Sequence, residues 1–365
     1  MLLLLQILQK NSNPARYDYM NTETIVIRSE SDLSQLNRAG EILRSSGLVA
    51  FPTETVYGLG GNALDKTASK KIYKAKGRPS DNPLIVHIAT PEEAEKYCIT
   101  NELYYELAAS FMPGPLTVIL PKKYIDGVPV VPDETTGGLD SVAIRCPADP
   151  VAHKLIVSAG VPIAAPSANT SGSPSPTSAD HVIHDLFGKI DMIIDGGESV
   201  FGLESTVVRI SDKTIYLLRP GAVTAEQLSI FADELIIADE HLKDGERPLS
   251  PGMKYKHYAP AKPLYLVCGE EEQILDFFCK KQKEENCAII CYDEDSDVLC
   301  PDNLFLLGKR SDLLSHAHRL FDFLRKTDVT DASVVYARLP DKEGIGLALY
   351  NRLIRASGHN IINLK

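Results

Sequence analysis

Two cations, Lys76 and Arg78, stand on a short loop with a restricted backbone. Gly77 separates them and Pro79 follows them, directly after a run with a helical pattern at residues 67–76. Cations at the C-terminal end of a helix complement the helix dipole, which is the simpler interpretation. A constrained loop with two cations also suits a preorganised clamp for phosphate groups. We favour the clamp, and the surrounding residues must decide between the two interpretations.

Further polar side chains stand at the ends of expected strands or beside them. They are Thr53, His87, Thr117, Arg145, Ser167, Asn169, Ser205 and Arg219, with Asn82 in the loop after the cation pair. Ligands of open α/β folds gather at strand ends, so these residues are candidates for one site. The sequence contains no G-x-S-x-G elbow, no H-E-x-x-H and no Walker-type loop. Cations, hydroxyls and amides instead suit the positioning and charge neutralisation typical of phosphoryl and nucleotidyl transfer.

Each of these residues also has a simpler interpretation when it is taken alone. His87 lies in an apolar strand and is then a core histidine, while Thr117 is then a residue that favours β-structure. Ser167 and Asn169 suit Asx and Ser turns. Arg145 lies inside a short apolar strand, so it needs a carboxylate partner from the protein or from a substrate.

Short β-rich runs alternate with helical patterns along the first two thirds of the chain. Strands are expected at 25–27, 48–51, 84–88, 116–120, 142–145, 163–164, 192–194, 206–210 and 215–218, and helices at 32–46, 67–76 and 92–111. The glycine-rich run 58–61 predicts a turn at a strand end. This mixture predicts an α/β domain with a mixed sheet.

A second alternation begins after Pro263. Strands are expected at 264–267, 288–292 and 333–337, and helices at 271–283, 311–326 and 345–356. This rhythm predicts a small doubly wound domain. Residues 240–262, between the two, are rich in Pro, Gly, aromatics and cations. A passive linker is usually small and polar, so we expect this one to dock onto the protein.

The composition limits the classes of function. The 365 residues carry a formal net charge of -11. An acidic chain is a poor generic binder of nucleic acid, although a local basic cleft stays open. The apolar residues 1–8 are too few to cross a bilayer, which needs about 20. No other segment is long and apolar enough, and residues 1–19 are expected to be an extension before a cleaner start at Met20.

The cysteines and histidines indicate neither a disulfide framework nor a metal site. Seven cysteines are an odd number in a long chain. Cys287 and Cys291 bracket an apolar strand, where residues four apart lie about 13 Å from each other and cannot share one zinc ion directly. His181 and His184 accompany no carboxylate motif. We expect buried, reduced thiols, surface or capping histidines, and no protein-held metal.

Several motifs in one order give the chain a specific resemblance. They are Pro52–Gly60, Lys76–Pro79, Asn82–Leu84, Pro113–Thr117, Ala165–Gly172, Glu204–Thr206 and Arg219–Gly221. Together they resemble the YrdC-type threonylcarbamoyl-AMP synthases in their long two-domain form. Residues 250–260 look like the linker of that family, and residues 351–356 look like its last helix. Met112, where an aromatic is expected, and Gly61, where Ala is usual, depart from the pattern.

The resemblance implies the fold and its division. It implies an α/β fold in which a YrdC-like domain with a twisted mixed sheet precedes a small Rossmann-like three-layer α/β domain. The expected boundaries are a disordered extension at 1–21, the catalytic domain at 22–235, a linker acting as a lid at 236–262 and the C-terminal domain at 263–365.

The resemblance also implies a reaction. L-threonine, bicarbonate and ATP, with Mg²⁺ on the triphosphate, give threonylcarbamoyl-AMP and pyrophosphate. A partner transferase then modifies an adenosine next to the anticodon of tRNA. The implied location is the cytoplasm, and the implied partners include a weak contact with RNA but no membrane.

Site residues carry over by motif position. Lys76 and Arg78 are the implied catalytic residues and neutralise the ATP phosphates. The implied nucleotide contacts are Asn82, Thr117, Ser167, Asn169, Ser205 and Arg219. Thr53, His87 and Arg145 line the implied threonine pocket, with Arg145 facing the carboxylate. Tyr255, His257 and Tyr258 belong to the implied lid.

The main alternative is an RNA-binding module of the same fold without this catalysis. Lys76 and Arg78 would then contact RNA phosphates, but a threonine-sized pocket and a lid would have no purpose. Carbamoyl-adenylate chemistry of the hydrogenase-maturation type would require zinc-finger and acylphosphatase-like segments that the sequence lacks. A dehydrogenase would require a glycine fingerprint that the C-terminal part lacks.

Overall fold

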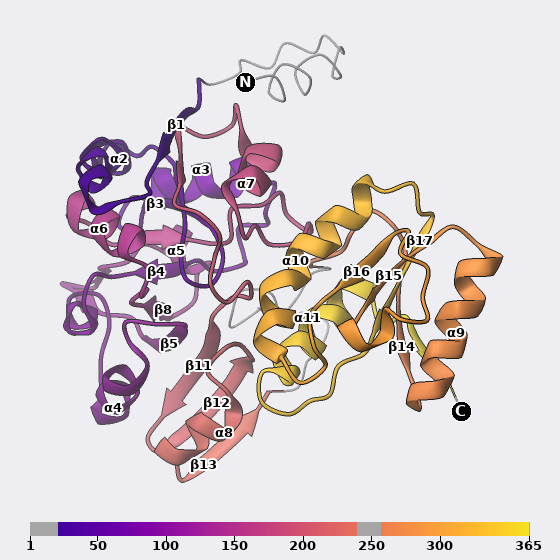
Figure 1. Cartoon of the computed structure of the whole chain (residues 1–365). Coiled ribbons are helices and arrows are strands. Elements are labelled where there is room, and N and C mark those ends of the chain that lie inside the picture. The colour runs from indigo at the N-terminus through magenta and orange to yellow at the C-terminus, as the bar shows by residue number, and fades with distance from the viewer. Residues whose placement is uncertain (1–20, 239–256, 365) are drawn as a thin grey trace.

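The computed structural model describes residues 21–238 and 257–364. Two α/β units lie side by side, each built around its own sheet (Figure 1). The first unit comprises residues 21–238 and the second unit residues 257–364. This arrangement confirms the predicted fold class. Residues 1–20, Tyr255 and most of the expected linker lie outside the described residues.

The first unit contains an eleven-stranded mixed sheet in the order β1-β10-β2-β3-β9-β4-β8-β5-β11-β12-β13. Its strands are β1 (Glu23–Val26), β2 (Val49–Phe51), β3 (Gly58–Asn62), β4 (Ile85–His87), β5 (Leu116–Pro121), β8 (Ser141–Arg145), β9 (Ile163–Ala165), β10 (Met192–Asp195), β11 (Thr206–Ser211), β12 (Thr214–Arg219) and β13 (Glu234–Ile237). A separate hairpin joins β6 (Tyr124–Ile125) and β7 (Val128–Pro129).

Helices cover both faces of this sheet. They are α2 (Leu36–Arg44), α3 (Lys66–Lys76), α4 (Glu102–Phe111), α5 (Asp133–Thr136), α6 (Pro150–Ala159), α7 (Ala179–Leu186) and α8 (Ala225–Leu228), with 3₁₀ turns at Glu30–Gln35, Pro91–Lys96 and Ser229–Phe231. Strand alternation decides which core each residue joins. Val49 and Phe51 pack with α2 and α6, whereas Ala50 between them packs in the core under α3, α4 and α7.

The expected helix over residues 92–111 is wrong in its first part. A 3₁₀ turn ends at Lys96, and α4 begins only after Asn101, whose side chain accepts a hydrogen bond from the Tyr104 amide at 2.9 Å. An N-cap of this kind starts a new helix because it satisfies one of the open amides of the first turn. The helical pattern in the sequence therefore extends over two separate helical segments, the 3₁₀ turn and α4.

The predicted turn at residues 58–61 is also wrong, because these glycines form most of β3. A Cβ atom on Gly60 would lie 2.8 Å from Ile163 Cγ2 and 2.9 Å from Phe51 Cε1. The glycine lets β3 lie between its antiparallel neighbours β2 and β9 under a close-packed core.

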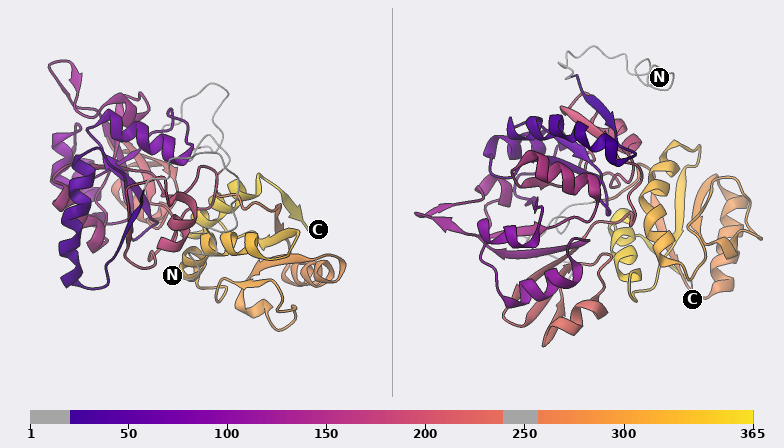
Figure 2. Two further views of the ribbon diagram at one scale, coloured as in Figure 1. Left: turned by 90° about the horizontal axis from the view of Figure 1, so that it is seen from above. Right: turned by 60° about the vertical axis from the view of Figure 1, so that its left-hand side comes forward.

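The second unit is a five-stranded parallel sheet in the order β16-β15-β17-β14-β18. Its elements are β14 (Leu264–Cys268), α9 (Glu271–Glu284), β15 (Cys287–Cys291), a 3₁₀ turn (Asp293–Asp295), β16 (Leu304–Leu306), α10 (Leu313–Val329), β17 (Val334–Arg338), α11 (Gly346–Ser357) and β18 (Ile361–Asn363). Helix α9 packs on one face, and α10 and α11 pack on the other (Figure 2). The three layers are as predicted, although the strand order differs from the usual 3-2-1-4-5.

Helices α10 and α11 also face the first unit. Their apolar cluster includes Val56 and Leu203 of the first unit. Gly202, with φ of 71°, lies so close to α10 that a Cβ atom would be 2.6 Å from the Ala317 carbonyl oxygen. The two units therefore share a packed interface.

The cysteines of the described residues form no disulfide, and Cys287 and Cys291 are buried at the two ends of β15. Within the same residues, no three His, Cys, Asp or Glu side chains are grouped so that they could hold a metal ion. None of the described helices combines the length and apolarity needed to cross a membrane.

Replacing Gly60 by alanine should destabilise the protein by about 1–3 kcal/mol, because the added methyl group overpacks the core between Ile163 and Phe51. Gly61→Ala is the matched control, since its Cβ would meet only side-chain atoms at 3.1 Å or more. Urea denaturation measures both variants. Equal stability of the two would contradict the packing of β3.

Candidate active site

A cavity of about 630 Å³, counting its open mouth, lies in the first unit where it meets the second. Most of the predicted site residues line it: Thr53, Arg78, His87, Arg145, Ser167, Asn169, Ser205, Arg219, His257 and Tyr258. Lys76, Asn82 and Thr117 are buried outside the lining, and Tyr255 lies outside the described residues.

The sheet register places three of these residues in one row. His87 of β4 pairs with Arg145 of β8, and Arg145 pairs on its other side with Thr117 of β5. Directly paired residues of neighbouring strands point to the same face, so the three side chains stand side by side. Residues 28 and 58 positions apart in the sequence meet for this reason.

Lys76 ends helix α3 but does not serve that helix as a cap. Gly77, with φ of 62°, is the C-cap, and the Lys76 ammonium donates to the carbonyl oxygen of Ser167, to that of Asn169 at 2.6 Å and to Asn169 Oδ1 at 3.2 Å. The side chain is only 2% exposed. Burial and the charge of Arg78 lower the pKa of Lys76. Lys76 therefore fixes the backbone of the next cavity loop from behind.

Arg78 lies on the cavity wall itself. Its Nε donates to the carbonyl oxygen of Asn82 at 3.4 Å and its Nη2 to that of Pro83 at 3.3 Å. The loop that carries Arg78 thus folds back to hold its own guanidinium. The buried side-chain amide of Asn82 has no hydrogen-bond partner within the described part of the chain. A buried amide left in this state costs free energy, because the described residues supply no partner for it.

Ser205 is held by two other predicted residues. Arg219 Nη2 donates to Ser205 Oγ at 3.0 Å, and Arg219 Nε donates to its carbonyl oxygen at 3.0 Å. Thr117 Oγ1 lies 2.8 Å from Ser205 Oγ and supports it from outside the cavity. Burial lowers the pKa of Arg219 to about 10, so it remains a cation at neutral pH.

Arg145 has a carboxylate partner within the protein. Its Nη2 lies 2.8 Å from Glu54 Oε1, and both side chains are buried. Burial raises the pKa of Glu54, but Arg145 outweighs this effect and holds the pKa below its usual value. Sequence reasoning left the partner open and missed Glu54, although it stands between Thr53 and Thr55 in a quoted motif.

His87 is neutral in this setting. Its Nδ1 lies 3.2 Å from the carbonyl oxygen of Ile85 and 3.3 Å from that of Ile163. Burial first and Arg145 second lower the pKa of His87 to about 3. Two carbonyl acceptors require a proton on Nδ1, so the ring presents Nε2 as an acceptor.

The second unit contributes an arginine next to the cavity. Arg352 of α11 is fully buried, and its Nε lies 2.8 Å from Oε2 of Glu204, which lines the cavity. The other carboxylate oxygen of Glu204 accepts a hydrogen bond from Ser175. Burial raises the pKa of Glu204, but Arg352 and then Arg219 bring it below its usual value. No local pattern singled out this pair, because its members lie 148 positions apart.

His257 and Tyr258, the two described residues of the predicted lid, close one side of the cavity. The Tyr258 ring stacks on Phe321 of α10 with 5.2 Å between centroids, and Arg352 lies 5.7 Å from the same ring. Burial and Arg78 lower the pKa of His257 to about 3, and its Nε2 has no partner among the described residues.

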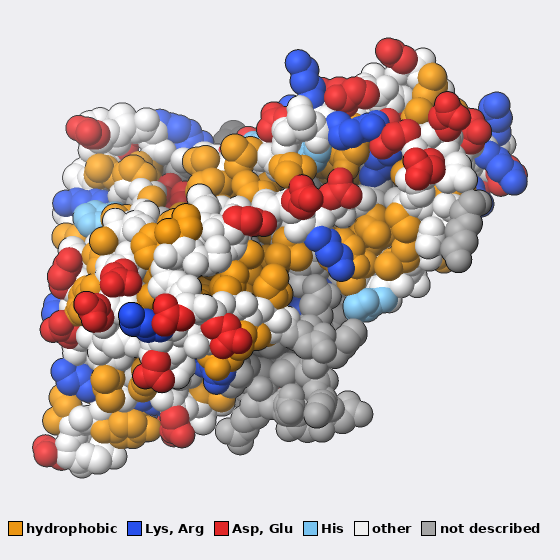
Figure 3. All heavy atoms as spheres, turned by 90° about the horizontal axis from the view of Figure 1, so that it is seen from below, with side chains coloured by type: hydrophobic (Ala, Val, Ile, Leu, Met, Phe, Trp, Pro, Cys, Tyr) orange, Lys and Arg blue, Asp and Glu red, His pale blue; other side chains and the backbone are white. Residues whose placement is uncertain are grey.

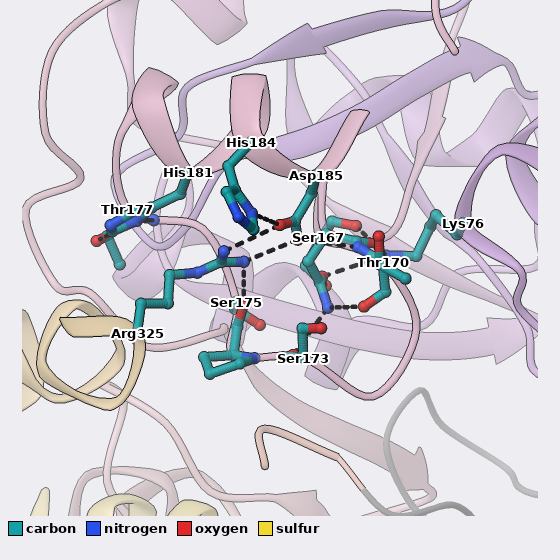
Figure 4. A network of polar contacts seen from close by, with 12 residues as sticks. Lys76, Ser167, Thr170, Ser173, Ser175, Thr177, His181, His184, Asp185 and Arg325 are labelled. Carbon is teal, nitrogen blue, oxygen red and sulfur yellow. Dashed lines mark hydrogen bonds and ion pairs between the residues drawn. The ribbon is translucent and has the colours of Figure 1, made fainter. Parts of the chain in front are cut away.

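The loop of residues 167–175, called the 167–175 loop below, supplies four cavity-lining side chains. Ser167 Oγ donates to Asn169 Oδ1 at 2.5 Å, and Asn169 Nδ2 donates to the carbonyl oxygens of Thr170 at 2.8 Å and Ser173 at 2.9 Å (Figure 4). Ser167 and Asn169 therefore form hydrogen bonds within a turn and also line the cavity.

Comparisons with known proteins cover nearly the whole chain. A family model described as "Telomere recombination" matches residues 41–221, and one described as "Threonylcarbamoyl-AMP synthase, C-terminal domain" matches residues 223–358. The chain is 44% identical to a threonylcarbamoyl-AMP synthase of Pyrococcus abyssi over 94% of its length and 100% of the relative. It is also 44% identical to one of Bacillus subtilis, over 90% of this chain and 94% of the relative.

A solved structure agrees with these relatives. The crystal structure of P. abyssi Sua5 complexed with L-threonine superposes with a TM-score of 0.86 at 43% identity. The match covers 94% of this chain and 100% of the other.

Replacing His87 by asparagine should remove a pH dependence of stability. The pKa of His87 is about 3 in the folded protein and about 6.5 in the unfolded chain. Between these values only the unfolded chain binds the proton, so the wild type loses stability as the pH falls below about 6.5. The amide of His87→Asn can still donate to Ile163. Between pH 8 and pH 5, the free energy of unfolding of the wild type should fall by about 2 kcal/mol more than that of the variant.

Urea denaturation at a series of pH values measures this difference. His153→Asn, on the exposed side of α6, is the matched control and should keep the wild-type pH dependence. A His87→Asn curve parallel to that of the wild type would refute the neutral buried histidine.

Replacing Arg352 by methionine should cost about 3–5 kcal/mol, because Glu204 is left buried without its counter-charge. The double variant Arg352→Met/Glu204→Gln should recover most of this loss. Lys280→Met, which removes an exposed pair with Glu284 on α9, should change little. Denaturation midpoints measure all three variants, and a double variant as unstable as the single one would show that packing, not charge, explains the loss.

Proposed function

Because the chain belongs to the threonylcarbamoyl-AMP synthase family, we propose that it makes threonylcarbamoyl-AMP from L-threonine, bicarbonate and ATP and releases pyrophosphate. It is an enzyme of the nucleotidyltransferase type. The product serves the threonylcarbamoyladenosine modification of tRNA next to the anticodon.

The reaction has two chemical steps. The threonine amine attacks the carbon of bicarbonate, water leaves, and a carbamate forms. A carbamate oxygen then attacks the α-phosphorus of ATP, and the bond to pyrophosphate breaks. Both reactants of the second step are anions, and their repulsion scales as about 332/(ε·r) kcal/mol for each pair of charges.

The observation that carries the proposal is the set of guanidinium groups around one cavity. Arg78, Arg145 and Arg219 all line it, together with the hydroxyls and amide of the 167–175 loop. Fixed cations in a site that excludes water offset charge repulsion without reorganisation during the reaction. A cavity of this kind suits the meeting of two anions.

We assign the nucleotide to the side of the cavity bounded by Arg78 and Arg219. Arg78 would neutralise phosphates from the wall, and Lys76 would add its charge from behind the 167–175 loop while holding that loop in place. Ser167, Asn169 and Ser205 would hold the nucleotide. Thr117 would act through Ser205, and the buried Asn82 amide would gain the partner that the described residues do not supply.

We assign threonine to the neighbouring side, formed by Thr53, His87 and Arg145. Arg145 would share its guanidinium between Glu54 and the threonine carboxylate. Thr53 Oγ1 already donates to the Val56 carbonyl oxygen at 2.6 Å and lies 2.8 Å from Thr55 Oγ1, so its position is fixed. The neutral His87 would offer Nε2 as an acceptor.

Magnesium would enter with the triphosphate. Glu204, which lines the cavity, and Glu54, the buried partner of Arg145, are both paired with arginines. They are poor candidates for direct metal ligands, and Mg²⁺ commonly binds through substrate phosphates and water. His257 and Tyr258, with Tyr255, would form a lid that protects the mixed anhydride from hydrolysis.

The further partners follow from the chemistry. The labile product needs a transferase that passes the threonylcarbamoyl group to tRNA, with which the chain would make at most a weak contact. We propose a cytoplasmic location, because ATP, bicarbonate and tRNA meet there.

The alternative of an RNA-binding module has less support. The cations of the site are buried, with Lys76 2%, Arg78 9% and Arg145 4% exposed. Side chains buried to this degree cannot reach the phosphates of an RNA backbone. On the face shown in Figure 3, acidic and basic side chains are interspersed over both units. The relatives named above are synthases as well.

A pyrophosphate assay with each substrate omitted in turn tests the proposal. The full-length protein should release pyrophosphate only with ATP, threonine and bicarbonate together. Arg78→Gln should lower kcat by about 100- to 1000-fold, because a cation at the phosphates is lost. Arg28→Gln, at an exposed pair with Asp195, is the control and should keep full activity. Release without threonine would overturn the assignment.

A further inference from the structure

Arg325 of α10 reaches from the second unit into the first. Its Nη1 lies 3.1 Å from Asp185 Oδ1, and its Nη2 lies 2.9 Å from Asp185 Oδ2 (Figure 4). The same Nη2 donates to the carbonyl oxygen of Pro174 at 2.5 Å. One planar guanidinium thus holds a carboxylate in bidentate geometry and a loop carbonyl at once, which a lysine cannot reproduce.

Asp185 connects this contact to the backbone of the 167–175 loop. It lies near the end of α7, is buried, and accepts a hydrogen bond from the Thr170 amide through Oδ2 at 3.0 Å. Its Oδ1 also lies 2.9 Å from His184 Nδ1. Arg325 therefore holds the loop at two points, at Pro174 directly and at Thr170 through Asp185.

Lys76 holds the same loop from the opposite side. Its ammonium binds the carbonyl oxygens of Ser167 and Asn169, while the Ser171 amide donates to the Lys76 carbonyl oxygen at 2.9 Å. The Ala259 amide, just after the lid residues, donates to the Gly172 carbonyl oxygen at 3.1 Å. The contacts of Arg325 complete a set of fixed points along a loop of small polar residues.

This loop has little regular structure to keep it in place. Its cavity-lining members are Ser167, Asn169, Ser173 and Ser175. Fixing a loop backbone costs conformational entropy, and a ligand that must order the loop binds more weakly. Contacts that order the loop beforehand move this cost from the binding step to folding.

We propose that Arg325 is a positioning residue through which the second unit orders the nucleotide side of the cavity. This inference rests on the proposed function and extends it, because it gives the second unit a part in nucleotide binding. Arg325 touches no substrate and acts through Asp185 and the 167–175 loop.

Steady-state kinetics of Arg325→Gln in the full-length protein test this role. The KM for ATP should rise about tenfold, because the loop must be ordered when the nucleotide binds. The KM for threonine should change less than about twofold, since Thr53, His87 and Arg145 lie on other elements. Asp185→Asn should give the same pattern, and combining the two substitutions should add little to either one.

Two controls separate positioning from simple docking of the units. Arg319→Gln changes an arginine of the same helix that donates to the Leu306 carbonyl oxygen within the second unit at 2.8 Å. Asp322→Asn weakens another contact across the interface, in which His181 Nε2 lies 3.3 Å from Asp322 Oδ1 without contact to the loop. Both variants should keep the wild-type KM for ATP.

Amide hydrogen exchange gives a readout that does not depend on turnover. Peptides covering residues 167–178 should exchange faster in Arg325→Gln, and peptides of β14 and β15 should not. An unchanged KM for ATP, an equal rise in the KM for threonine, or the same effect from Asp322→Asn would each overturn the inference. A wild type that releases no pyrophosphate would instead refute the proposed function. Hydrogen exchange would still test whether Arg325 orders the 167–175 loop.

Discussion

The buried pair of Glu204 and Arg352 is the interaction on which the rest of the site depends. Either charge alone inside the protein would cost several kcal/mol, and together they are tolerated because each satisfies the other. The carboxylate comes from the cavity wall and the arginine from α11 of the second unit. Glu204 also accepts a hydrogen bond from Ser175, so one carboxylate joins the second unit, the wall and the 167–175 loop.

The charges in and around the cavity are not only positive, because buried carboxylates accompany the arginines. Glu54 and Glu204 each take up one arginine, which lowers the net positive charge that the unliganded protein must bury. Lys76 is surrounded by carbonyl oxygens, and the two histidines near the cavity are neutral. A folded protein can keep such a site because almost every buried charge has a partner of opposite sign or a set of dipoles. The hydroxyls and amides of the cavity lining can then orient a bound ligand.

Sequence patterns predicted much of this arrangement, and the failures have physical reasons. The α/β class, most strands and the cation pair follow from local periodicity and turn chemistry. The strand at residues 58–62 was not predicted. Its glycines are needed because a side chain at Gly60 would collide with Ile163 and Phe51, which lie elsewhere in the sequence. Arg145 visibly needed a carboxylate, but only the folded sheet selects Glu54. Asp185 and Arg325 had no local signal, and Arg352 stood in a motif that indicated only the last helix, because the partners of all three lie in the other unit.

The separation of Glu204 and Arg352 by 148 positions bears on how the protein is made. Domains generally fold in order as the chain leaves the ribosome, beginning at the N-terminus. The first unit is then synthesised long before α11 emerges, and during that interval Glu204 lacks its ion-pair partner Arg352. The cavity wall is completed only when the last helix docks. Assembly of the site is therefore a late event in biosynthesis, and a chain that stops early lacks a finished cavity even where its first sheet is complete.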